Sequence, residues 1–270
     1  MSNHLTVQFR RIGAEIELVE NPRFRTPFVI DMKGETFLIS GRDLGKEDIK
    51  ILDIEPENKH LLLMWRERET GTKHKYLCGH DERHYFVAAV PDNPNKGKTG
   101  TYGVKNVSDA MEALKPEKVK ERERMAGVKG HSRRERHNAA RKRQGEWFFI
   151  PVWNPISLKR APILRNEPIN RGGGKPHLCE YLVRDGGTKV WTCKDYPNGL
   201  VDKDYRRLLS RKPEAKKWFW TPRVADAKVY VRGKISHSDH ATLDLGSQWH
   251  EVLMNRENEA PSMKHMRFLD

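Results

Sequence analysis

The sequence predicts an α+β fold with an N-terminal β-rich module, a basic helical segment, and a C-terminal antiparallel β-meander that includes one or two helices. Three observations predict it. Short segments with alternating apolar and polar side chains come first, a strongly basic stretch with few apolar side chains follows, and alternating segments then return. We therefore expect three parts, over residues 1–107, 108–145 and 146–270.

The N-terminal module is predicted to be a small, mostly antiparallel sheet or barrel. The alternation typical of half-buried strands occurs in three segments: residues 14–19, 28–30 and 35–39. Residues 60–65 and 74–78 flank a loop with Gly71, which indicates a hairpin. Residues 85–90 are almost wholly apolar, which predicts a central strand buried on both faces.

The middle segment is predicted to be helical. Ordinary helix patterns cover residues 109–114 and 117–126. Ser132 and Glu135 fit a capping box, which predicts a third helix that ends near Gly145. These helices would have few apolar side chains to bury, so we expect either a mobile arm or a cover over a groove.

The C-terminal part is predicted to combine a hairpin, a helix and a meander. Residues 180–183 and 189–193 flank Asp185-Gly186-Gly187, a strong hairpin signal. Residues 202–210 have the period of a helix. Alternating segments then predict the strands of the meander: residues 228–235, 241–245 and 249–254.

A basic stretch, residues 115–143, indicates a polyanionic partner. It carries 12 Lys/Arg against 4 Asp/Glu and supplies more than half of the chain's net charge of +14. Unpaired cations beside a phosphate backbone release condensed counterions, which favours binding. The cations that we expect to contact phosphates are Lys118, Lys120, Arg133, Arg134, Arg136, Arg141, Lys142 and Arg143.

Aromatic side chains beside basic ones favour a nucleic acid with unstacked bases. We expect Trp147 and Trp220 to offer stacking surfaces, because both lie close to basic residues in the sequence. No helix presents a clear face for reading the major groove, so RNA or another single strand is preferred over duplex DNA. We expect a nucleic-acid-binding component of a ribonucleoprotein or nucleic-acid-processing assembly, with protein partners there.

Histidines near the C-terminus suggest an alternative, a histidine-dependent or metal-dependent phosphodiesterase or nuclease. His237, Asp239 and His240 lie in a predicted turn, and His250 lies on the strand after it. Imidazoles with a carboxylate can act as general acid and base at a phosphate, or can bind a metal. The spacing matches no standard zinc pattern, and scattered surface histidines, with Asp239 serving the turn, are the plainer interpretation.

A second cluster, Cys78, His80 and His84, could supply three of the four ligands of a zinc ion. Zinc is therefore a candidate cofactor. The plainer interpretation is a loop in which Asp81 and Glu82 form salt bridges with neighbours.

A further alternative is an adaptor whose basic arm binds an acidic protein. The sequence contains no phosphate-binding loop, no dinucleotide-binding glycine pattern, no G-x-S-x-G elbow and no paired CxxC motif, which disfavours the enzymes that use them. Three cysteines and the lack of a long apolar stretch favour a cytoplasmic protein that does not contact a membrane.

Overall fold

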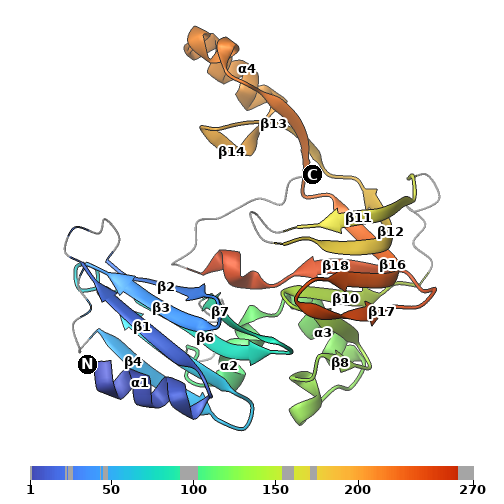
Figure 1. Cartoon of the computed structure of the whole chain (residues 1–270). Helices are drawn as coiled ribbons and strands as arrows, with labels where there is room; N and C mark the ends of the chain where they lie inside the picture. Colours follow the sequence, from blue (N-terminus) through green and yellow to red (C-terminus); the bar gives the residue numbers. More distant parts are fainter. Residues whose placement is uncertain are drawn as a thin grey trace. The chain divides into compact units, whose positions relative to one another are not determined.

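The computed structural model describes residues 2–21, 23, 27–42, 44, 48–91, 103–153, 161–170 and 175–260 (Figure 1). The described residues fall into two compact units, the first up to Ala140 and again from Met254, the second over Arg141–Leu253. Helices and several mostly antiparallel sheets make the chain broadly α+β and rich in strands, which confirms the predicted class at that level.

The first unit begins with a helix packed on a small sheet. Helix α1 (Ser2–Arg11) was not predicted, although Leu5 and Phe9 recur at helical spacing and both are buried. The sheet that follows has three strands, with β1 parallel and β2 antiparallel to the central β3; their order is β1 (Glu15–Glu20), β3 (Thr36–Gly41) and β2 (Val29–Lys33).

The second sheet of this unit is an antiparallel meander, and it confirms the predicted hairpin. Its strands are β4 (Ile49–Glu55), β5 (His60–Arg66), β6 (Lys73–Asp81) and β7 (His84–Val90). β7 lies at an edge of this sheet, so the prediction of a central strand was wrong. The sequence of β7 is apolar because both faces of this strand are covered by other side chains.

Two hydrophobic clusters provide these covers. The larger cluster contains side chains of α1, of β3 and of one face of β5, including Phe9, Phe37 and Leu63. The smaller cluster lies on the other face of the sheet, where Leu62 of β5 and Ala88 of β7 pack with helix α2. A strand with apolar neighbours on both faces needs no alternation, whatever its place in the sheet.

Helix α2 (Val107–Leu114) and helix α3 (Glu117–Met125) lie where the sequence predicts them. The side chain of Asn106 caps α2 by accepting a hydrogen bond from the N–H of Asp109 at 2.7 Å, whereas no side chain of a described residue caps α3 in this way.

The predicted third helix is wrong. In its place are a 3₁₀ turn and three short strands: η1 (Gly130–Arg133), β8 (His137–Asn138), β9 (Arg141–Gln144) and β10 (Trp147–Pro151). Gly145 has φ +56° in the two-residue turn between β9 and β10, where Gln144 pairs with Trp147. A positive φ at glycine suits a helix end and a hairpin turn alike, so the strand pairing, and not the glycine, distinguishes the two.

The main sheet of the second unit holds the predicted C-terminal strands. From one side its strands are β11 (Leu164–Ile169), β12 (His177–Asp185), β16 (Lys228–His237), β18 (His250–Met254), β10 and β9. Strand β17 (His240–Asp244) pairs with β16, as β18 does. The three strands of the expected meander therefore exist, but the last two share one partner.

An arm, residues 188–225, interrupts this sheet between β12 and β16. It contains β13 (Thr188–Cys193), β14 (Tyr196–Val201), α4 (Asp202–Arg211), η3 (Pro213–Lys217) and β15 (Thr221–Ala225). Its strands form their own sheet in the order β14-β13-β15, and Figure 1 shows the arm extending away from the strands of the main sheet.

The predicted hairpin between residues 180–183 and 189–193 is wrong, because β12 pairs with β11 and β16 while β13 pairs with β14 and β15. Asp185 pairs with Lys228, and Thr188 pairs with Ala225. The glycines between them therefore mark the passage of the chain from one sheet into another.

Beyond β18, the turn η4 (Arg256–Glu259) returns to the first unit, where Glu257 accepts a hydrogen bond from the N–H of Ala89 on β7 at 3.2 Å. Within the part of the chain that the structure describes, no helix is long and apolar enough to cross a membrane.

Candidate nucleic-acid interface and histidine cluster

Part of the basic stretch is tied into the first unit by buried ion pairs. The ammonium group of Lys115 lies 2.8 Å from Glu123 Oε2 and donates to the carbonyl oxygen of Arg133 at 2.7 Å. Lys115 and Glu123 are both buried. Residues 115–133 are therefore held by a charged core, not arranged as a solvated arm.

Several of the cations expected to bind phosphate are paired with acids from other parts of the same unit. Arg133 contacts Glu112 at 2.7 Å, and Arg134 contacts Glu55 at 2.9 Å. Arg136 pairs with Asp81 and Glu82, which agrees with the plainer interpretation of that loop. The four acids inside the stretch are thus supplemented by acids from β4, β6 and α2.

The remaining predicted cations are distributed over both units. Lys120 contacts Glu117 at 2.8 Å, and Lys118 is exposed on α3. Arg141, Lys142 and Arg143 lie on β9 in the second unit. Arg141 is buried with its guanidinium 5.3 Å from the ring centre of Phe148, and Lys142 donates to the carbonyl of Asp244 at 2.6 Å.

The two aromatic side chains expected to stack on bases have different surroundings. Trp147 is only 2% exposed. Its ring and that of His177 meet in an edge-to-face arrangement, with 6.3 Å between the ring centres. It offers no face to a base in this structure. Trp220 lies in the arm, partly buried, and its indole N–H donates to the carbonyl of Ala215 at 2.8 Å.

The arm concentrates aromatic rings that the sequence analysis did not group together. Trp191 stacks on Tyr205 at 4.9 Å, and Trp218 stacks on Trp220 at 6.0 Å. Tyr196 stacks with both of the latter rings. Contacts between rings that are distant in sequence hold together β13, β14, α4 and the segment between η3 and β15.

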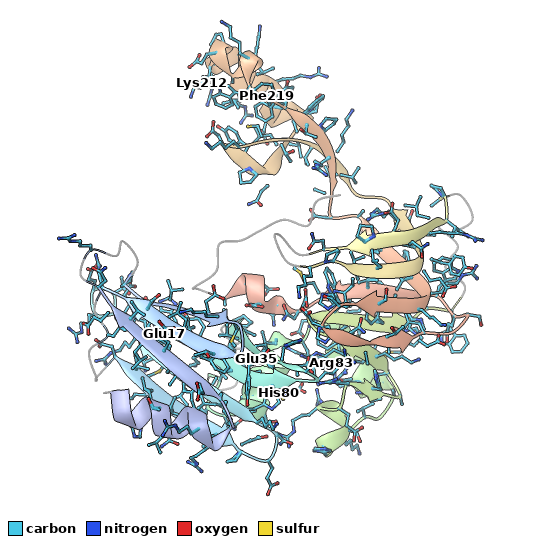
Figure 2. All side chains as sticks on the ribbon, viewed as in Figure 1. Glu17, Glu35, His80, Arg83, Lys212 and Phe219 are labelled. Carbon is cyan, nitrogen blue, oxygen red and sulfur yellow. The ribbon has the colours of Figure 1, made fainter. Side chains whose placement is uncertain are left out.

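Phe219 lies between two members of this cluster and is 96% exposed (Figure 2). Cations lie against the neighbouring rings. Lys212 Nζ is 4.8 Å from the ring centre of Trp218, and Lys189 Nζ is 5.4 Å from that of Trp191. A fully exposed ring beside cations is the arrangement that stacks bases and attracts their phosphates.

The arm is also strongly basic. It carries ten Lys/Arg against four Asp/Glu, and all ten cationic side chains are exposed. Arg206 pairs with Asp202 at 2.7 Å and Arg207 with Asp204 at 3.7 Å along α4. For six others no ion pair with a described residue occurs: Lys194, Lys203, Arg211, Lys216, Lys217 and Arg223. A charge count over a window of this length would have identified the arm.

A histidine cluster, His177, His237 and His240, forms on the main sheet of the second unit. Leu178 pairs with Ser236 and His237 pairs with His240, so neighbouring positions on β12, β16 and β17 bring the three rings together. The ring centre of His237 lies 4.1 Å from that of His177 and 4.9 Å from that of His240. His177 was not predicted, because only strand pairing brings it near the other two.

The surroundings of the cluster set its charge. Burial and the neighbouring imidazoles lower the pKa of His177 to about 3, so its ring is neutral at neutral pH. Asp239 accepts a hydrogen bond from Lys175 at 2.7 Å, and this contact lowers the pKa of the carboxyl group. His250 is buried on β18 and belongs to no such group; burial lowers its pKa, and its ring contacts the carbonyl of Gln248 at 2.9 Å.

Cys78, His80 and His84 are not brought together. Cys78 is buried in the larger hydrophobic cluster, and burial raises the pKa of its thiol. His80 pairs with Tyr85 across the β6–β7 ladder, so His84, the next residue, lies on the opposite face of the sheet. His84 instead contacts Glu35 at 2.5 Å. The geometry therefore gives the predicted zinc ligands no common centre.

Comparisons with known proteins do not extend this description. No family model, no curated protein and no solved structure matches the chain.

Proposed function

We propose that the chain binds single-stranded nucleic acid and that the arm is its principal contact surface. The observation that carries this proposal is the almost complete exposure of Phe219 within a cluster of stacked rings and exposed cations. A single exposed apolar side chain is ordinary on a protein surface, but the combination of an exposed ring, stacked rings beside it in the sequence and exposed cations suits the stacking of bases.

The chemistry of the arm suits a single strand. Every base has an aromatic face, and stacking on an exposed side chain requires bases that are not already stacked in a duplex. The exposed cations of α4 and η3, among them Lys203, Arg211 and Lys216, would lie along the phosphates of the same strand. RNA and single-stranded DNA share these features, and the proposal covers both, as partners within a ribonucleoprotein or nucleic-acid-processing assembly.

The basic stretch takes a smaller part in this proposal than the sequence suggests. Arg133, Arg134 and Arg136 already contact carboxylates, and a phosphate would have to compete with these partners. The contacts of Lys142 and Arg143 with backbone carbonyls likewise hold these side chains to the sheet. Their main role in this account is to fix the fold.

An acidic protein is the alternative partner of the arm. Its carboxylates would pair with the same cations, but it would have to supply an apolar pocket for Phe219 in addition, whereas every nucleotide carries both a phosphate and the face of a base. Nucleic acid uses both features of the arm, and we therefore favour it.

Fluorescence anisotropy of labelled oligouridine and oligothymidine, titrated with the full chain, tests the proposal. Phe219→Ala is expected to weaken binding about 5-fold to 100-fold, the equivalent of about 1–3 kcal/mol for one stacked base. Trp153→Ala is the matched comparison, because Trp153 is also exposed but lies outside the arm. Unchanged binding by the Phe219 variant, or a larger loss in the Trp153 variant, would refute the assignment of the arm.

A further inference from the structure

We infer that His177, His237 and His240 form a metal site in the second unit, suited to Zn²⁺. One nitrogen from each ring can be chosen so that all three lie within 4.8 Å of one another. Around tetrahedral zinc, with bonds of about 2.0–2.1 Å, ligand nitrogens are about 3.3 Å apart. Rotations of partly exposed side chains can close this difference, because His237 and His240 flank a surface turn. The inference is independent of the proposed nucleic-acid binding.

The ring of His177 is the strongest observation. Its side chain is 2% exposed, and neither Nδ1 nor Nε2 has a hydrogen-bond partner among the described residues. A buried polar group without a partner is costly and requires an explanation. A metal ion bound to one nitrogen would supply the missing partner. The ring of His237 stacks on the face of the His177 ring and leaves the edges of that ring available.

His237 already has the orientation of a metal-binding imidazole. Its Nδ1 accepts a hydrogen bond from the backbone N–H of Asp239 at 3.1 Å, so its proton is on Nε2, which donates to the carbonyl of Lys175 at 3.3 Å. Histidines that bind metals commonly donate their other ring N–H to a backbone carbonyl. The unprotonated Nδ1 is thus the donor atom that a metal would take over from Asp239.

Gly145 keeps space beside the other two rings. A side-chain carbon at this position would lie 3.1 Å from His240 Nε2 and 3.6 Å from His177 Nε2. The turn also requires glycine, since φ is +56°. Two imidazole nitrogens therefore face one small volume that no side chain fills.

The donor set indicates the class of metal. Three imidazoles suit Zn²⁺ and similar transition metals, whereas Mg²⁺ and Ca²⁺ require oxygen ligands. The carboxylate of Asp239 is engaged by Lys175 and Ser238 and is not counted as a ligand. Three protein ligands leave one tetrahedral position for water or a substrate atom, the arrangement of catalytic zinc.

The test uses the full chain, stripped with a chelator and then titrated with Zn²⁺ and, separately, Co²⁺. We expect one equivalent of Zn²⁺, the visible absorption bands of tetrahedral Co²⁺, and a Zn²⁺-dependent rise in melting temperature. His177→Phe should weaken Zn²⁺ binding about 100-fold or more and remove the Co²⁺ bands. His131→Ala, at an exposed histidine of the first unit, should change neither.

His177 is buried, so its variant could unfold. His240→Asn is the second variant, since this ring is partly exposed, and circular dichroism checks that it folds. It should lose the Co²⁺ bands while its melting temperature without metal stays near that of the original chain. Less than one equivalent of Zn²⁺ in the original chain, or equal binding by folded His177 and His240 variants, would overturn the inference.

Discussion

The ammonium group of Lys115 lies 2.8 Å from Glu123 Oε2, with both side chains buried in the first unit. Asn138 donates to the other carboxylate oxygen of Glu123 at 3.1 Å, so three parts of the basic stretch meet at one acid. A charge buried in this way is stable only while its partners remain in place. The pair thus joins Lys115, α3 and Asn138 within the first unit.

Removing the negative charge of Glu123 should strongly destabilise the first unit. For Glu123→Gln we expect the free energy of unfolding to fall by about 3 kcal/mol, because Lys115 then keeps a buried charge with one acid fewer. Glu121→Gln is the matched control: this acid is exposed on the same helix, and its effect should stay within about 0.5 kcal/mol. Urea unfolding followed by circular dichroism measures both. Equal effects would show that the pair contributes nothing.

Acid should destabilise the second unit through its buried histidines. Burial lowers the pKa values of His177 and His250, so both rings stay neutral in the fold, while the unfolded chain protonates them below about pH 6.5. The unfolded state then binds more protons, and stability falls as the pH drops from about 6.5 toward 3, with no change above that window.

His177, with a folded-state pKa of about 3, should cost about 2 kcal/mol between pH 7 and pH 5, and His250 should add a loss in the same direction. Urea unfolding of the chelator-treated chain at both pH values measures the difference. His250→Phe should reduce this difference in unfolding free energy, whatever its effect on stability at pH 7. The reason is that the change of stability with pH depends only on the protons taken up on unfolding. A variant with the original pH dependence would contradict the assignment to His250.

Gly187 should matter more than the adjacent Gly186 at the base of the arm. Both have positive φ, +92° at Gly187 and +70° at Gly186. A side-chain carbon at Gly187 would lie 2.5 Å from Val224 Cγ1, whereas a side-chain carbon at Gly186 would have no other atom within 4 Å. Gly187→Ala should therefore destabilise the pairing of β13 with β15 by at least about 1 kcal/mol more than Gly186→Ala. Hydrogen exchange of the β13 amides measures this, and equal protection in the two variants would be the contrary result.

Local patterns predicted much of the fold. Alternation located β1, β2 and β3, the hairpin signal around Gly71 located β5 and β6, and the apolar run located β7. Helix patterns located α2, α3 and α4. The strands and α2 bury apolar faces in the two clusters of the first unit, as such patterns predict. Helical spacing was also present in α1, where Leu5 and Phe9 mark the buried face. The third helix failed because Ser132 and Glu135 fit a cap locally, whereas the pairing of Gln144 with Trp147 determines the structure there.

The candidate sites depended on long-range pairing, which spacing does not reveal. His177 reaches His237 only because β12 lies beside β16, and 60 residues of sequence separate the two rings. The basic stretch shows the opposite case. Its charge was correctly counted, but the acids that pair with Arg134 and Arg136 lie on or beside distant strands. Trp220 belongs to the ring cluster for the same reason, through contacts with Tyr196 and Tyr205.

The salt dependence of binding should distinguish the arm from the basic stretch. If the arm contacts the phosphates, Lys212→Ala should weaken binding of a single strand and reduce the slope of log affinity against log salt by less than one unit. Lys50→Ala, at an exposed cation of the first unit, is the matched control and should leave the slope unchanged. Titrations at about 50 and 200 mM salt give both slopes. An equal effect of the two substitutions would mean that binding is not localised on the arm.

The most direct test of the central claim is to remove the arm and measure what binding remains. Thr188 and Ala225 are ladder partners, so an Asn-Gly turn in place of residues 189–224 can close the strands and keep the main sheet intact. If the arm is the principal surface, this variant should fold, as judged by circular dichroism, and bind oligouridine at least about tenfold more weakly than the intact chain. A folded variant with the affinity of the intact chain would contradict the account.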